Sequence, residues 1–203
     1  MDRALNALFR VIVQRDGTEL VRSLQENPAL ARAALKSGAT RQAEKDTFLT
    51  EILHYVYGGD TALHVAAAAH WPEGIKALLE AKADVSARNR HGQTPLHYAC
   101  AGGPNLPGWD PQAQATSIQT LLGAGADPNA TARGEITPLH TAVRNRCSLA
   151  VEALLRGGAH SAVKNKRGST PAHFATVSSG RGGTGSAHAK AEQAKIAALL
   201  KRD

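Results

Sequence analysis

The chain has 203 residues, a formal net charge of +7 and only 4% aromatic side chains. Its length suits one or two compact domains, and its aromatic-poor apolar content, carried by alanine and leucine, favours short packed helices over a β-sandwich. No apolar run is long enough for a transmembrane helix, and the N-terminus lacks the apolar core of a secretory signal. With two cysteines only, we expect no disulfide framework and a reducing, cytoplasmic location.

Residues 1–58 show helical periodicity without a repeated motif. Two amphipathic segments are separated by Asp16-Gly17, and Asn27-Pro28 ends the second. Residues 41–57 are predicted to form one more helix, because their apolar side chains fall on one helical face. These side chains are Phe48, Ile52, Tyr55 and Val56.

From residue 59 onward, a four-residue motif recurs. Thr-Pro-Leu-His, or a close variant of it, begins at Thr61, Thr94, Thr137 and Thr170. The intervals are 33, 43 and 33 residues, so the middle one equals the common period plus ten inserted residues. Each motif is followed by small residues and then by two adjacent leucines. The leucine pairs lie at residues 78–79, 121–122, 154–155 and 199–200.

Each part of this pattern has a physical reason. Threonine is a good N-cap, and proline at the next position has its φ angle already set. Small residues let neighbouring helices approach closely, while the leucines fill the space between helix layers. Gly125 and Gly158 fall where the second helix of a repeat ends, which predicts a left-handed backbone there. Lys82 occupies the equivalent place in the first repeat.

Four copies of the motif in register, each with its leucine pair, resemble the ankyrin repeat over roughly residues 59–203. The resemblance implies an all-α solenoid of helix–turn–helix units joined by β-turn fingers, in which stacking buries the apolar faces. It also implies that residues 1–58 hold a degenerate N-terminal capping repeat, over about residues 3–36, plus the extra helix. We expect one continuous domain. The arrangement further resembles bacterial ankyrin-repeat proteins, a likeness that brings no assigned activity.

Two insertions rich in turn-forming residues interrupt alternate repeats, near residues 102–111 and 178–187. Both fall between the inner and outer helix of a repeat, at the end opposite the fingers. Trp109 is the one large apolar residue in the first insertion. It either folds back onto the solenoid or serves as a binding anchor for a partner.

Four histidines close the successive motifs, at His64, His97, His140 and His173. Stacked repeats place equivalent atoms roughly 10 Å apart, whereas zinc needs ligands at about 2 Å. We therefore expect no metal site, and each imidazole should hydrogen-bond nearby backbone and tie helix to finger. The glycine-rich segment 180–186 has neither the preceding strand nor the lysine of a phosphate loop. It is predicted to be a surface loop, or one that orders on a partner, and no cofactor is expected.

Neither cysteine has the surroundings of a nucleophile. Cys100 takes a small-residue position in an inner helix, so it should be packed, whereas Cys147 lies just past an inner helix and should be more exposed. A catalytic thiolate needs a positioned base, and the repeat histidines are committed elsewhere. No serine- or carboxylate-based constellation is evident either, so we expect no enzymatic activity.

Basic residues collect on the fingers and at the end of the third inner helix. In ankyrin proteins the finger tips and the inner helices usually form the concave binding surface. Mapped onto this sequence, that surface includes one acid, Glu135, near its C-terminal half. The predicted partner-binding residues are Arg88, Arg90, His91, Arg133, Arg144, Asn145, Arg146, Lys164, Lys166 and Arg167, with Trp109 as the possible anchor.

These observations favour a monomeric interaction module for a protein with an acidic surface, which it scaffolds, sequesters or inhibits. Ordinary solvation of charged turns is the simpler alternative for the basic residues. Nucleic-acid binding through the same residues is a weaker alternative, because no aromatic side chains interleave with them as stacking platforms. Nothing in the sequence favours a membrane partner.

Overall fold

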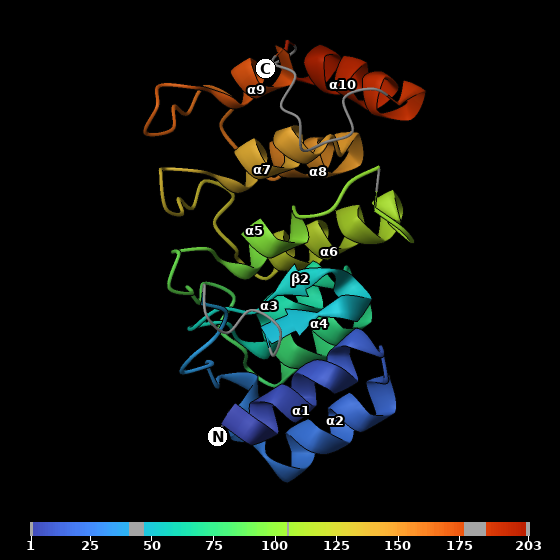
Figure 1. Ribbon diagram of the computed structural model, residues 1–203, viewed down its shortest axis with the longest axis vertical. Coiled ribbons are helices and arrows are strands. Elements are labelled where there is room, and N and C mark those ends of the chain that lie inside the picture. The colour runs from blue at the N-terminus through green and yellow to red at the C-terminus, as the bar shows by residue number, and fades with distance from the viewer. Residues whose placement is uncertain (1, 41–46, 105, 177–185, 202–203) are drawn as a thin grey trace.

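The computed structural model describes residues 2–40, 47–104, 106–176 and 186–201. They form a stack of helix pairs, with the two chain ends at opposite ends of the stack (Figure 1). The pairs are α1 (Asp2–Val13) with α2 (Gly17–Glu26), α3 (Ala62–Ala68) with α4 (Pro72–Glu80), α5 (Pro95–Ala99) with α6 (Pro111–Gly123), α7 (Pro138–Asn145) with α8 (Ser148–Arg156), and α9 (Pro171–Thr176) with α10 (Ala187–Leu199).

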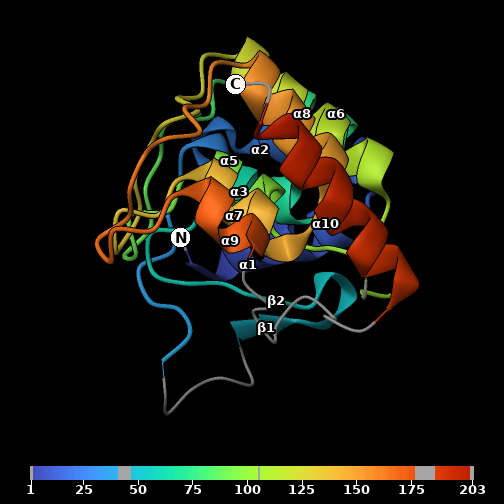
Figure 2. The same cartoon turned by 90° about the horizontal axis from the view of Figure 1, so that it is seen from above.

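Successive pairs stack in two layers. The inner helices α1, α3, α5, α7 and α9 contact one another in that order, and so do the outer helices α2, α4, α6, α8 and α10. Figure 2 looks along the stack, and the loops that join the pairs project together to one side as fingers. The predicted all-α solenoid is therefore confirmed.

The repeated motif starts each inner helix as its chemistry predicts. Thr61, Thr94 and Thr137 have extended backbone and cap α3, α5 and α7, each followed at once by the first helical residue. The first leucine of the pair, at residues 78, 121 and 154, is fully buried between the helix layers, whereas the second is only partly buried. A single apolar core runs from Leu5 to Ile196, so every pair stabilises its neighbours.

The ends of the outer helices have the predicted left-handed backbone. The φ angle is +91° at Gly125 and +87° at Gly158. At the equivalent place, Lys82 adopts φ +66° although it carries a side chain. The register of the repeats deduced from sequence is thus correct at this position.

The N-terminal helix pair packs as its periodicity indicates. Leu5, Leu8, Phe9 and Ile12 of α1 are buried, and so are Leu20 and Leu24 of α2, while Val21 remains 44% exposed. Asp16 caps α2 by accepting a hydrogen bond from the Glu19 amide at 2.9 Å. After α2, a 3₁₀ turn, η1 (Pro28–Ala31), leads into the first finger.

The prediction of a helix over residues 41–57 is wrong. Residues 41–46 lie outside the described part, and the remainder forms a hairpin of β1 (Phe48–Leu49), the 3₁₀ turn η3 (Thr50–Ile52) and β2 (His54–Tyr55). Phe48 pairs with Tyr55 across the two strands, with ring centroids 4.7 Å apart. Such cross-strand aromatic pairs stabilise hairpins, and their sequence spacing also happens to fit one face of a helix.

This hairpin belongs to an insertion at the tip of the first finger. In ordinary fingers the amide of Asn89 donates to Gln93 O at 3.0 Å, and the amide of Asn165 donates to Ser169 O at 2.9 Å. In the first finger the same bond joins Leu35 to Asp60, at 2.8 Å. Residues 36–56 are therefore inserted into the finger, which the sequence pattern did not indicate.

The two insertions expected from sequence differ in how much of them the structure describes. Residues 102–110, apart from residue 105, run between α5 and α6. Residues 177–185 lie outside the described part, so the predicted insertion at 178–187 is represented only by its end. There Ser186 caps α10 by accepting from the Ala189 amide at 3.1 Å.

Candidate functional site

Three basic side chains occupy equivalent places in successive fingers. The amides of Arg90, Arg133 and Lys166 donate to the preceding finger, at Gly58 O (2.8 Å), His91 O (2.8 Å) and Gly134 O (2.9 Å). Each of the three residues lies four positions before the threonine of its repeat, and each is exposed. We call these three residues the finger ladder, because the backbone bonds fix them one above another along the stack.

Buried asparagines hold two of the three fingers rigid. The Asn89 side chain accepts from the amides of His91 and Gln93, at 2.9 and 3.0 Å. Asn165 repeats this arrangement with the amides of Arg167 and Ser169, at 2.9 and 3.0 Å. Since the turns are already ordered, a partner that binds them has little backbone entropy to remove.

The motif histidines join each inner helix to the next finger, as predicted, in three repeats. Nε2 lies 3.1 Å from Gln93 O in His64, 3.0 Å from Ile136 O in His97 and 3.0 Å from Ser169 O in His140. Nδ1 of each ring accepts from the amide of its own threonine, at 3.2, 3.2 and 3.3 Å. His173, in the last pair, is exposed.

This geometry requires a neutral ring. Nδ1 faces an N–H group, which can only donate, so it must accept, and Nε2 faces a carbonyl oxygen, so it must carry the proton. Burial acts in the same direction and lowers the pKa of His64 and His97 to about 4. The histidines are therefore structural links and not metal ligands. Within the described residues, no group of three or more His, Cys, Asp or Glu side chains is placed to hold a metal ion.

The basic side chains of the finger after α4 are partly engaged in internal contacts. Arg88 donates from Nη1 to Gly92 O at 3.0 Å and to Thr131 O at 2.7 Å. The Arg90 guanidinium donates to Ala39 O and lies 5.1 Å from the centre of the Tyr57 ring. Burial, with a smaller contribution from the neighbouring arginines, lowers the pKa of His91, so this residue adds no positive charge at neutral pH.

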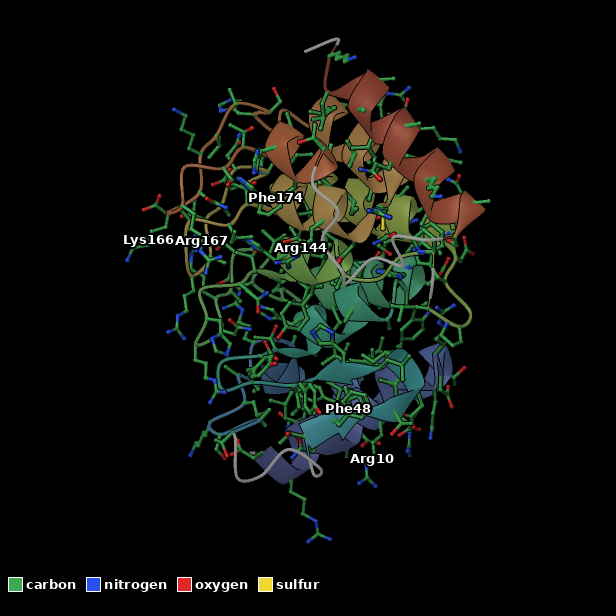
Figure 3. All side chains as sticks on the ribbon, turned by 45° about the horizontal axis from the view of Figure 1, so that its top comes forward. Arg10, Phe48, Arg144, Lys166, Arg167 and Phe174 are labelled. Atoms are coloured by element: carbon green, nitrogen blue, oxygen red, sulfur yellow. The ribbon has the colours of Figure 1, made fainter. Side chains whose placement is uncertain are left out.

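The finger before α9 carries the most accessible charge. Lys164, Lys166 and Arg167 are exposed, and in the described part of the chain no side-chain hydrogen bond or ion pair engages them. Figure 3 shows Lys166 and Arg167 side by side at the outer edge of this finger, with Arg144 nearer the helices. Glu135, in the preceding finger, is also exposed and has φ +59°.

The structure does not bring all the predicted basic residues to one surface. Arg146 is only 4% exposed, because it ends α7 in the left-handed conformation (φ +60°) and its side chain turns inward. Asn145 donates to Cys100 O at 3.0 Å and is half-buried, and Arg144 is half-buried as well. Arg146 therefore does not belong to the exposed basic surface that the sequence predicted.

Burial tests the predictions made for the two cysteines. Cys100 is fully buried, as expected, but Cys147 is also buried, at 1% exposed, and not more accessible as predicted. Cys147 caps α8, where its thiol lies 3.0 Å from Gly102 O in the first insertion, and burial raises its pKa to about 12. Trp109 folds back onto the solenoid and donates to the side chain of Gln114 at 2.8 Å.

Sequence reasoning missed a buried polar network under the fingers. Asp60 is fully buried and accepts from the Tyr57 amide (2.7 Å), the Asn89 side chain (2.9 Å) and the Tyr98 hydroxyl (2.8 Å). Burial raises the pKa of this carboxyl group. The network fastens the first two fingers to α5. An acid before the first motif threonine is the one sequence feature that marks it, and the other repeats lack it.

No helix among the described residues combines the length and the apolarity needed to cross a bilayer.

The chain matches only a small part of each relative found by sequence. Mouse protein phosphatase 1 regulatory subunit 12A is 34% identical over 98 residues, which are 48% of this chain and 9% of that protein. Mouse ankyrin repeat and SOCS box protein 16 is 46% identical over 111 residues, which are 55% of this chain and 24% of that protein.

The family model described as ankyrin repeats (3 copies) matches residues 9–106 and 112–184. The match covers most of the chain and includes the end of α1 and all of α2, which lack the four-residue motif. It agrees with the stacked pairs, the capped inner helices and the hydrogen-bonded fingers described above. The chain belongs to the ankyrin-repeat family.

Proposed function

We propose that this domain binds a protein with an acidic surface through the finger ladder and the basic residues beside it. Ankyrin repeats generally mediate protein–protein interaction. The observation that carries the proposal is the register of Arg90, Arg133 and Lys166, which backbone bonds hold on one exposed edge. Lys164 and Arg167 extend that edge in the finger before α9.

The arrangement suits recognition of several carboxylates at once. Neighbouring rungs are roughly 10 Å apart, as repeat stacking sets them, which is about one Debye length at 0.1 M salt. Their fields overlap at low salt and attract an acidic partner mainly by raising the association rate. Arg133 adds a planar guanidinium, which pairs with a carboxylate through two hydrogen bonds.

The relatives support a role without catalysis. One is named a regulatory subunit of a phosphatase, and ankyrin repeats generally mediate binding between proteins. We further propose that this chain is a monomeric cytoplasmic module that controls or localises its partner. Whether it scaffolds, sequesters or inhibits that partner depends on which surface of the partner the ladder covers.

Binding of two polyanions of matched length tests the proposal. The probes are fluorescent poly-glutamate of about 20 residues and a fluorescent DNA duplex of about 20 base pairs, titrated at 50 and 200 mM salt. We expect the protein to bind poly-glutamate, with an affinity that falls steeply as salt rises. Preferential binding of the duplex would replace the proposal with nucleic-acid recognition, and binding of neither probe would refute it.

A further inference from the structure

The insertion in the first finger is closed at its base. The Ala39 amide donates to Val56 O at 2.7 Å, so residues 40–55 leave the finger and return to it at the same point. The two chain segments approach so closely there that a Cβ atom on Gly38 would lie 2.5 Å from the Tyr57 carbonyl carbon. The two sides of the finger are therefore joined through Ala39 and Val56, without the residues between them.

The hairpin of this excursion lies over the inner helices. The His54 ring packs against the Tyr98 ring of α5, with centroids 4.5 Å apart. Residues 50–54 also line one side of a cavity of about 320 Å³, and its other side includes Ala68 and Ala69, at the end of α3, and Ala101. Figure 2 shows β1 and β2 on the side of the inner helices that faces away from the outer helices.

Several features indicate that the hairpin is loosely held. Each strand has two residues, and all four are only half-buried. Leu53, at the turn, is 44% exposed and adopts φ +49°, which is strained for a residue with a side chain. Nε2 of His54 is buried without a hydrogen-bond partner, which costs free energy. Segments with such small net stabilisation open before the core does.

We propose that the inner-helix face over α3 and α5 is a peptide-binding surface which the chain fills with its own residues 47–56. The fitting ligand is an extended or hairpin peptide that sets an aromatic or imidazole ring on Tyr98 and an aliphatic side chain at the cavity rim. In the structure, the hairpin's own Leu53 takes this place at the rim, and Leu106 of the first insertion lies at the rim as well.

The inference rests on the proposed function in one respect, because it adds regulation for a partner that binds the finger ladder and also reaches the neighbouring inner helices. A partner that reaches from the fingers onto α3 and α5 must displace the hairpin. Its apparent affinity is then the intrinsic affinity multiplied by the fraction of molecules in which the hairpin is open. A partner that touches the fingers alone is unaffected.

The test uses the chain's own segment as the probe. Residues 40–55 are replaced by two glycines, which the Ala39–Val56 contact permits, and a fluorescent peptide of residues 40–56 is added to the shortened protein. We expect micromolar binding to the shortened protein and at least tenfold weaker binding to the intact one. The same peptide with His54→Ala should bind at least fivefold more weakly, because it loses the ring that contacts Tyr98.

A second variant keeps the test decisive if the shortened protein does not fold. In the intact chain, Phe48→Ala removes the ring that pairs with Tyr55 and should let the added peptide bind more tightly than it binds the wild type. Failure of a folded shortened protein, or of this variant, to bind the peptide would overturn the inference. Reversing Arg133 and Lys166 to Glu should leave binding of this peptide unchanged. Peptide binding therefore tests the inference independently of poly-glutamate binding, which tests the proposed function.

Discussion

The amide of Lys166 donates to the carbonyl oxygen of Gly134 at 2.9 Å, and through this bond the last described finger takes its position from the one before it. The same bond joins Arg133 to His91 and Arg90 to Gly58. Repetition of one backbone contact thus converts three basic residues, far apart in sequence, into one exposed ladder. Their alignment depends on the stack being intact, so stability and binding are linked in this protein.

Replacement of Lys82 by glycine tests the repeat register. Lys82 has φ +66°, and a side chain in that region costs roughly 1 kcal/mol. We expect Lys82→Gly to change the free energy of unfolding, measured in urea, from nearly zero to about 1 kcal/mol in the stabilising direction, since added flexibility of the unfolded chain offsets part of the gain. Lys76→Gly, inside α4, is the control and should destabilise by about 1 kcal/mol. Clear destabilisation by Lys82→Gly would contradict the assignment.

Stability should fall in mild acid because of the buried histidines. The pKa of His97 is about 4 in the folded protein, against 6.5 for a free histidine, so the unfolded chain binds more protons between these values. Stability is therefore complete above about pH 6.5 and is lost as the pH falls toward 4, by at most roughly 3 kcal/mol for each such histidine. His64 adds an equal effect.

Urea unfolding between pH 4 and 8 measures this loss. His97→Gln keeps a neutral acceptor and donor at all these pH values, so its stability should depend less on pH than that of the wild type. His173→Gln, at an exposed position, should leave the pH dependence as it is. Equal slopes for the wild type and His97→Gln would show that His97 is not held neutral by the fold.

The sequence specified the repeated part of the fold well and its additions poorly. The Thr-to-His spacing determined where α3, α5 and α7 begin, because each cap is a local interaction that recurs. The prediction from Phe48 and Tyr55 was wrong, because they lie seven positions apart and this spacing suits two helical turns as well as a hairpin. Arg146 was predicted to be exposed because it is charged. Its burial depends instead on the backbone angle at the end of α7, which the residue's charge does not determine.

Trp109 should contribute to stability because it folds back onto the solenoid. Its indole N–H donates to Gln114, and its ring packs at the edge of the core. We expect Trp109→Ala to lower the free energy of unfolding by about 2 kcal/mol. Leu106→Ser, in the same insertion but 43% exposed, is the control and should change it by less than about 0.5 kcal/mol. An unchanged free energy of unfolding for Trp109→Ala would favour the alternative, in which this side chain is an anchor for a partner.

Both cysteines should resist thiol reagents while the protein is folded. Burial raises the pKa of Cys147 to about 12 and that of Cys100 well above its ordinary value, so little thiolate exists at neutral pH. We expect labelling by an aromatic disulfide reagent at pH 8 to be slow in buffer and complete within seconds in concentrated urea. Rapid labelling of one thiol per chain in buffer would mean that the first insertion does not cover Cys147.

The most direct test of the binding account is charge reversal on the finger ladder. Arg133→Glu with Lys166→Glu should weaken poly-glutamate binding at 50 mM salt at least tenfold, with a nearly unchanged melting curve. Lys76→Glu with Lys190→Glu makes the same change of charge on the exposed faces of α4 and α10 and should weaken it less than threefold. Equal losses for the two pairs would show that net charge, and not the ladder, attracts the acidic ligand.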